Sequence, residues 1–236
     1  MHHPKAVLVF SKPLSVARGN KQDPFSLVAW NDVDMLYSSM LADTVATLEK
    51  ISGCDVFLYS PEKKKSPDVA SMFSMGIEAR PYAANRFDET VAAAIDSAFQ
   101  EGHQRVIVLL EPQPLLQSDL VKTVFAQLGM EDDCMVVGCF EDGDCYLVGL
   151  KSNYASAFLP STVEKSPNSS LFQRLCNLDT MLAPLPTSYS VQSTLSLHRL
   201  RLDIEARTGS SGDFPHRTHE SFKLLHRKYK IKYSKQ

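Results

Sequence analysis

The stretch from Met135 to Leu150, MVVGCFEDGDCYLVGL, decides the expected fold. Two apolar runs flank a short acidic segment, Glu141 to Asp144. An Asp-Gly pair between two β-prone runs is a strong hairpin signal, because glycine adopts the positive φ that a tight turn needs. One interpretation is a buried hairpin whose turn only faces water. The other is that Asp142 lies at a strand end of an α/β domain, where ligands usually bind. The residues alone favour the first interpretation.

Upstream of this stretch, apolar strands alternate with helical patterns. Continuous apolar runs at 5–10, 55–59 and 105–110 are typical of strands buried on both faces of a sheet. Between them, apolar residues recur with helical spacing over 33–48 and 87–99. This alternation predicts an α/β domain with three layers, α/β/α, around a mostly parallel sheet.

Two further local signals follow from the residues. Ser118 is expected to cap a helix that runs to Leu128. The polar segment 11–25 directly follows the first strand, and a loop of this length is usually functional or mobile. Neither a Walker phosphate loop nor a G-x-G-x-x-G motif follows that strand, so the two commonest nucleotide fingerprints are absent.

Composition is that of a cytoplasmic globular protein. Of the 236 residues, 44% are hydrophobic and 22% are charged, which suffices for a sizeable core. No apolar run approaches the roughly 20 residues of a membrane span, and the first residues do not form a signal peptide. The five cysteines include no C-x-x-C pair, so we expect them to be reduced and buried rather than metal ligands or disulfides.

Charge divides the chain into two expected parts. From Arg207 onward there are eight Lys or Arg against two Asp or Glu, although the whole chain carries −2. Residues 208–215, TGSSGDFP, have the composition of a linker. We therefore expect a domain over 1–206, then a linker and basic tail over 207–236. Such tails can bind nucleic acid, but more often they are solvated or dock on an acidic surface, and the second interpretation is favoured.

Four stretches together resemble a known family. They are VLVFSKP at 7–13, LYSSMLADT at 36–44, RFDETVAAAIDSAFQEGHQRVIVL at 86–109, and VVGCFEDGDCYLVGL at 136–150. Across about residues 5 to 205 the chain resembles small bacterial proteins grouped with the glycosyltransferases. These have the nucleotide-diphospho-sugar transferase (GT-A, Rossmann-like) fold and are related to the molybdopterin guanylyltransferases. In the last stretch Asp144 replaces a glycine of the family pattern.

The resemblance also implies a site, with several departures. The family's Gly-x-x-Lys-Thr-Arg-Leu loop, a cradle for the donor's diphosphate, is replaced by SKPLSVARGNKQ, which retains Lys12 and Arg18. Pro112 stands where the family has a metal-binding Asp, and Glu111 precedes it. Ser190-Val191-Gln192-Ser193 replaces a late Asp-x-Asp-Thr. Because Mg²⁺ and Mn²⁺ prefer carboxylate and water ligands, these changes weaken the expected metal site.

The resemblance therefore implies a nucleotide-sugar-dependent glycosyltransferase or a nucleotidyltransferase with altered phosphate and metal motifs. Lys12, Arg18 and Gly143 would contact the nucleotide-sugar donor, Glu111 would help to hold Mg²⁺ or Mn²⁺, and Asp142 would be the catalytic or orienting carboxylate. The alternative is a non-catalytic relative that binds a nucleotide or a partner protein. A third hypothesis, nucleic-acid binding by the basic tail, is the weakest.

Overall fold

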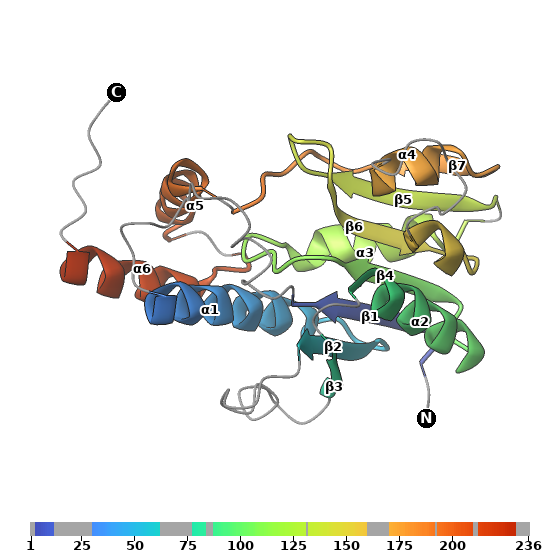
Figure 1. Cartoon of the computed structure of the whole chain (residues 1–236), viewed down its shortest axis with the longest axis horizontal. Helices are drawn as coiled ribbons and strands as arrows, with labels where there is room; N and C mark the ends of the chain where they lie inside the picture. Colours follow the sequence, from blue (N-terminus) through green and yellow to red (C-terminus); the bar gives the residue numbers. More distant parts are fainter. Residues whose placement is uncertain are drawn as a thin grey trace.

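A computed structural model shows an α/β protein with one central sheet (Figure 1). It describes residues 3–11, 30–61, 77–83, 87–130, 132–159, 170–191, 193–209 and 212–229. In chain order the elements are β1 (Lys5–Phe10), α1 (Trp30–Leu48), β2 (Asp55–Pro61), β3 (Ile77–Tyr82), α2 (Phe87–Gln100), β4 (Arg105–Leu109), α3 (Ser118–Gln127), β5 (Cys134–Cys139), β6 (Cys145–Leu150), the 3-10 helix η3 (Ala155–Phe158), α4 (Leu171–Cys176), β7 (Met181–Pro184), α5 (Thr194–Ala206) and α6 (His216–Tyr229).

The described strands form one sheet in the order β3-β2-β1-β4-β6-β5-β7. The pairs β2–β3, β1–β2, β1–β4 and β5–β7 are parallel. Strand β6 runs antiparallel to both of its neighbours, β4 and β5. The prediction of a mostly parallel sheet is therefore confirmed, as is the prediction that the two runs of the deciding stretch form adjacent strands.

Helices cover both faces of the sheet because the inner strands are apolar on both faces. On one face Leu8 and Val108 pack against Ile95 of α2 and Phe158 of η3. On the other face, Val9, Leu109 and their neighbours pack against α1 and α3. A third cluster joins α1, α5 and α6 at one end of the molecule (Figure 1). The three-layer prediction is confirmed.

Two glycines explain how the deciding stretch folds. In the β5–β6 connection, Gly143 has φ +92° and donates its N–H to the carbonyl of Phe140 at 3.0 Å. This conformation strains any residue with a Cβ. Gly138 lies against Tyr146, and a Cβ built there would be 2.4 Å from the ring atom Cζ. Tyr146 can then donate its hydroxyl to the Pro186 carbonyl at 2.9 Å, which ties the hairpin to the segment after β7.

The described part of the basic C-terminal segment is a helix, α6, that lies alongside α1 (Figure 1). The buried carboxylate of Asp43 in α1 accepts the N–H groups of Arg217 and Thr218 at 3.1 and 2.7 Å. It thus satisfies amides that a helix N-terminus otherwise leaves without partners. At the other end, Lys228 binds Asp32 at 2.7 Å. The division of the chain at residue 206 stays a prediction, and residues 216–229 are helical in this arrangement.

Asp213 makes a second long-range contact that the sequence does not predict. Ser118 does not cap α3, because Gln117 holds the cap position without a side-chain bond. The Asp213 carboxylate instead accepts the Ser118 N–H at 2.6 Å. Burial opposes the charge of Asp213, but hydrogen bonds from Lys50 and Ser118 outweigh it and hold the pKa of Asp213 below its ordinary value. The predicted Ser118 cap is wrong because a distant carboxylate takes that role.

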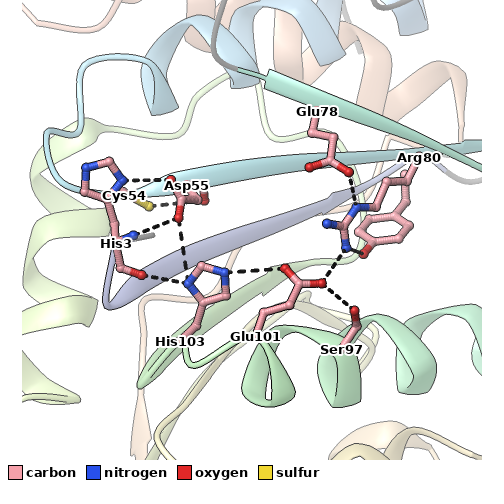
Figure 2. Close-up of polar contacts among 9 residues, drawn as sticks. His3, Cys54, Asp55, Glu78, Arg80, Ser97, Glu101 and His103 are labelled. Carbon is pink, nitrogen blue, oxygen red and sulfur yellow. Dashed lines mark hydrogen bonds and ion pairs between the residues drawn. The ribbon is translucent and has the colours of Figure 1, made fainter. Parts of the chain in front are cut away.

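At the amino ends of β1, β2 and β4, charged side chains form a network that we call the amino-edge network (Figure 2). His3 donates to Asp55 through its backbone N–H at 2.9 Å and binds it through Nδ1 at 2.7 Å. The buried His103 donates from Nδ1 to the His3 carbonyl at 2.8 Å, and its Nε2 lies 3.9 Å from Glu101. This network joins three neighbouring strands and the end of α2.

Arg80 of β3 extends the amino-edge network along the sheet (Figure 2). Its Nε binds Glu78 at 2.8 Å, and Nη1 donates to the Tyr59 hydroxyl at 3.1 Å. The guanidinium lies 4.1 Å from the centroid of the Phe57 ring, within the range of a cation–π interaction. The outer strand β3 is thereby fixed to β2 by charge as well as by backbone pairing.

All five cysteines are free thiols. Cys134 and Cys145 are buried, Cys54 and Cys139 are partly buried, and Cys176 is exposed. The prediction of reduced thiols is therefore consistent with the structure, while the prediction that all are buried is wrong for Cys176. Cys176 ends the short helix α4 at the surface, where packing does not require a small apolar side chain.

Among the residues that the structure describes, no helix is both long enough and apolar enough to cross a membrane.

Candidate functional site

The carboxyl edge of the sheet is where polar side chains gather around an open space. Strands β1, β4 and β5 run in the same direction, so their last residues lie at one edge. The antiparallel β6 begins at that same edge, directly after the β5–β6 connection. Loops at the carboxyl ends of parallel strands form the usual ligand crevice of open α/β sheets. We therefore expect a ligand site at the ends of β4 and β5 and the start of β6.

A pocket of about 250 Å³ lies at this edge, and we call it the carboxyl-edge pocket. It opens beside the first turn of α2, the end of β4, the start of β6, η3 and α4. Its apolar lining includes the buried side chains of Val91, Leu110 and Phe158. Its polar lining residues are Asp88, Asp144, Ser170 and Arg174. An apolar floor with a few polar groups is typical of small-molecule sites.

Three charged residues give this pocket its chemistry. Arg174 is fixed by a hydrogen bond from its Nε to the Ala157 carbonyl at 2.8 Å. Asp88 lies in the first turn of α2, and Asp144 directly precedes β6. Within the part of the chain that the structure describes, no hydrogen bond or ion pair engages the carboxylates of Asp88 and Asp144. The pocket can therefore offer one cation for an anionic group and two carboxylates for hydroxyl groups.

Local sequence fixes the two elements that carry Arg174 and Phe158. Ser170 caps α4 through its side chain, which accepts the Gln173 N–H, while the Gln173 side chain accepts the Ser170 N–H. This reciprocal arrangement starts the helix at a defined residue. Arg174 then reaches back to η3, so the two short elements are joined across the pocket.

A thiol lies in the pocket wall. The Sγ atoms of Cys145 and Cys139 are 4.0 Å apart across the β5–β6 pair. Burial raises the pKa of both thiols, and the neighbouring sulfur raises that of Cys145 further. Since the thiolate is the reactive form, these cysteines are suited to packing rather than to nucleophilic chemistry.

Asp142 and Gly143, which the sequence suggested as site residues, lie in the β5–β6 connection. The Asp142 side chain is exposed, and its Oδ1 accepts the N–H of Asp144 at 3.1 Å. That contact shapes the turn, as Asp does in many connections. Neither residue lines the carboxyl-edge pocket, whereas Asp144, two positions later, does. The roles of Asp142 and Gly143 in binding stay predictions.

Glu111, the suggested metal ligand, follows β4 at the same edge and is partly buried. Its Oε2 accepts the hydroxyl of Ser190 at 3.0 Å. The Glu141 N–H donates to the nearby Ser188 carbonyl at 2.9 Å. Residues 188–190 thus contact both the end of β4 and the β5–β6 connection. Glu111 is not among the residues that line the pocket.

The remaining predicted site residues, Lys12 and Arg18, lie outside the described residues, as does Gln192. Pro112, at the position of the expected metal ligand, is buried. Within the described ranges, no three His, Cys, Asp or Glu side chains come together in a way that could hold a metal ion. The described donor set therefore does not fit a metal held by protein ligands alone.

A family model described as "Uncharacterized protein conserved in bacteria (DUF2064)" matches residues 44–165, more than half of the chain. The chain belongs to this family. The matched segment runs from α1 past η3 and so includes the pocket's contributions from α2, β4 and β6. No curated protein matches the chain.

Solved structures show the fold. A candidate nucleotide-diphospho-sugar transferase from Desulfovibrio desulfuricans G20 is similar with a TM-score of 0.72 and 18% identity, over 96% of this chain and 98% of that one. A cytidylyltransferase from Leptospira borgpetersenii serovar Hardjo-bovis (strain JB197) gives 0.57 and 10%, over 100% and 99%. The 4-diphosphocytidyl-2C-methyl-D-erythritol synthase from Anaerococcus prevotii DSM 20548 gives 0.55 and 11%, over 86% and 97%. The predicted nucleotide-diphospho-sugar transferase fold is confirmed.

Sequence reasoning missed Asp88, Asp144 and Arg174. They come from three separate segments, so no local motif unites them. One signal was available for Asp144, which stands where the resembling family has a glycine. A carboxylate that replaces a glycine directly before a buried strand could have indicated Asp144 as a candidate site residue.

Proposed function

We propose that this chain binds a nucleotide-activated sugar at its carboxyl edge and is a glycosyl or nucleotidyl transferase. The observation that carries the proposal is the carboxyl-edge pocket itself, which combines Arg174, Asp88 and Asp144 over an apolar floor. It lies in a fold shared with a candidate nucleotide-diphospho-sugar transferase and with cytidylyltransferases. These similarities support the fold, and the pocket supports the chemistry.

Each pocket residue has a role in this proposal. The Arg174 guanidinium pairs with a phosphate, for which its planar fork of donors is suited. Asp88 and Asp144 accept hydroxyl groups of a sugar, since carboxylates are strong acceptors. Phe87 and Phe158 present apolar surface to the faces of the sugar or base. Lys12, Arg18 and Gly143 are proposed to contact the diphosphate, with Asp142 at the rim and Glu111 beside any divalent ion that accompanies the phosphates.

Binding is tested first, with a panel of nucleoside diphosphate sugars titrated into the full chain by calorimetry, with and without Mn²⁺. We expect saturable binding of at least one donor. Arg174→Gln should weaken that binding about 10- to 150-fold, the loss expected for one charge-assisted hydrogen bond of about 1.5–3 kcal/mol. Arg217→Gln is the matched control, because Arg217 is exposed on α6 and does not line the pocket. Equal losses in both variants, or no binding of any donor, would reject the proposal.

The second candidate is a non-catalytic relative that binds a nucleotide or a partner protein. Pro112, which takes the place of the expected metal-binding Asp and is buried, favours it. The two candidates differ in turnover. Either of two reactions supports the transferase. In glycosyl transfer, the sugar passes to an acceptor with release of the nucleoside phosphate; in reverse nucleotidyl transfer, added pyrophosphate cleaves the donor to a nucleoside triphosphate and a sugar phosphate. Binding that responds to Arg174→Gln without any release supports the non-catalytic relative.

A further inference from the structure

A second pocket, of about 220 Å³, lies between the helices α5 and α6. We call it the α5–α6 groove. Its lining residues are Arg201, Glu205, His219, Phe222, Lys223, His226 and Arg227. None of them belongs to the carboxyl-edge pocket, and the proposed transferase function does not use any of them.

Helical spacing explains why these side chains converge. On α6, the residues 219, 223, 226 and 227 follow one another at intervals that place them on one face of a helix. On α5, Arg201 and Glu205 are four residues apart and form an ion pair at 2.5 Å. Between the helices, the buried ring of Phe222 packs in the cluster that includes Leu200 and Ile204. The groove thus has an apolar floor and charged walls.

Positive charge dominates the groove. Arg201, Lys223 and Arg227 are cationic, whereas Glu205 is the one carboxylate among the lining residues. Glu220, outside the lining, pairs with Lys223 at 2.7 Å, but both side chains are about half exposed or more. Exposed ion pairs of this kind are weak and readily exchange partners. His219 and His226 add two imidazole N–H donors to the same space.

The groove is also held in shape. Asp43 fixes the first turn of α6 through Thr218, which is fully buried, and Lys228 binds Asp32 near the other end. The side chains of Ser39 and Ser221 meet at 2.7 Å between these contacts. Because α6 is attached to α1 along its length, its basic face is presented toward α5 before any ligand arrives. Preorganised charge of one sign in a concave site favours an ion of the opposite sign.

We propose that the α5–α6 groove is a binding site for a small phosphate-bearing anion, such as inorganic phosphate, pyrophosphate or a phosphomonoester. Two arginines and a lysine on facing helices provide the forked and point-charge donors that phosphate oxygens accept. A polymer such as nucleic acid would need an extended basic surface rather than one short groove between two helices.

The experiment titrates pyrophosphate, inorganic phosphate and a sugar phosphate separately into the ¹⁵N-labelled full chain in phosphate-free buffer. NMR locates each probe, because the amides of residues 219–227 report on the groove and those of residues 110, 144 and 145 report on the carboxyl-edge pocket. We expect saturable shifts at 219–227. Arg227→Gln and Lys223→Gln should each weaken binding about tenfold, one lost charge-assisted contact. Arg217→Gln removes the same charge from an exposed position of α6 and should leave the affinity within about twofold.

The outcomes separate this proposal from the proposed function. Arg174→Gln should leave the shifts at 219–227 unchanged, whether or not the carboxyl-edge pocket binds nucleotide sugars. Equal weakening by Arg217→Gln and Arg227→Gln would overturn the proposal, because it would show a diffuse basic surface. Tighter binding of a single-stranded oligonucleotide than of pyrophosphate, with equal losses in those two variants, would overturn it in favour of nucleic acid. Circular dichroism confirms that each variant remains folded.

Discussion

The two edges of the sheet arrange their charged groups differently. At the amino edge, the charged side chains of the network meet one another: His3 with Asp55, His103 with Asp55 and Glu101, and Arg80 with Glu78 (Figure 2). At the carboxyl edge, Asp88 and Asp144 face a pocket of about 250 Å³. At the amino edge the charged groups bind one another, whereas at the carboxyl edge Asp88 and Asp144 line a pocket that can accept a ligand.

This difference separates stability from function. Paired and buried groups contribute to stability, and removing one partner leaves the other buried without its bond. Carboxylates beside an apolar pocket contribute little to stability and offer acceptors to a ligand. We therefore expect substitutions at the amino edge to lower the free energy of unfolding, and substitutions in the carboxyl-edge pocket to lower ligand affinity.

The largest expected effect is at the amino edge, from His103→Ala. The side chain is fully buried, packs edge-on against Phe57 and donates to the His3 carbonyl. Its removal leaves a cavity and an acceptor without its donor, so the free energy of unfolding should fall by about 2–4 kcal/mol. Urea unfolding followed by circular dichroism measures it. His226→Ala, which removes an exposed imidazole, should change it by less than about 0.5 kcal/mol. Similar small losses in both variants would show that the amino-edge network is not stabilising.

The next effect concerns the carboxyl edge and compares two aspartates two positions apart. Asp144→Asn should weaken nucleotide-sugar binding about 10- to 100-fold, because Asp144 lines the pocket and the charge of its carboxylate strengthens a bond to a sugar hydroxyl. Asp142→Asn keeps the acceptor that binds the Asp144 N–H and should leave the affinity within about twofold. Calorimetry with the best donor measures both. A loss confined to Asp142→Asn would instead support the catalytic role that the sequence suggested for Asp142.

The sequence predicted those parts of the molecule whose structure is decided locally. The apolar runs that became β1, β2 and β4 are strands buried on both faces, and their short, continuous runs of apolar residues identify them in the sequence. The Asp-Gly pair located the β5–β6 connection, where Gly143 adopts its positive φ. In these cases the structure depends on residues close together in the chain, so the sequence pattern is sufficient to predict the strand or the turn.

The sequence did not predict what depends on distant partners. Helix α6 is rich in charged residues, and its first amides are satisfied by Asp43, which is 174 and 175 residues away along the chain. The composition of this segment therefore indicated a basic tail that is solvated or docked on an acidic surface, but not the helix or its partners Asp43 and Asp32. The sequence did not predict the carboxyl-edge pocket for the same reason. Its residues Asp88, Asp144 and Arg174 come together only when α2, β6 and α4 have packed. Sequence reasoning named Asp142 and not Asp144 because the turn signal and the pocket position lie two residues apart in one short segment.

A third prediction concerns how the free energy of unfolding depends on pH through the carboxylates of the amino edge. Burial opposes the charge of Asp55, but hydrogen bonds and charge from His3 outweigh it and lower its pKa, and a hydrogen bond from Ser97 together with Arg80 lowers that of Glu101. A carboxylate with a lowered pKa contributes stability that is fully present above its unfolded pKa, about 4, and is lost as the pH falls through the folded value. Unfolding free energy should therefore decline from about pH 5 toward pH 3. In Asp55→Asn that decline should be shallower, by about 1 kcal/mol. A profile with an unchanged slope would contradict this assignment.

The smallest expected effect on the free energy of unfolding comes from a Glu→Gln substitution, which can be compared at the two edges. Glu141 at the carboxyl edge binds Arg199 at 2.7 Å, but both side chains are half exposed or more, and such pairs contribute about 0.2–1 kcal/mol. Glu101 at the amino edge is less exposed, accepts the Ser97 hydroxyl at 2.6 Å and lies beside His103. Glu141→Gln should therefore lower the free energy of unfolding by less than Glu101→Gln does. The loss from Glu141→Gln should also largely disappear in 0.5 M salt, since salt screens exposed pairs over about 4 Å at such concentrations. Urea unfolding at low and high salt measures both variants. A larger loss from Glu141→Gln would mean that the Arg199 contact, which joins α5 to the β5–β6 connection, supports the carboxyl edge as firmly as the network of Figure 2 supports the amino edge.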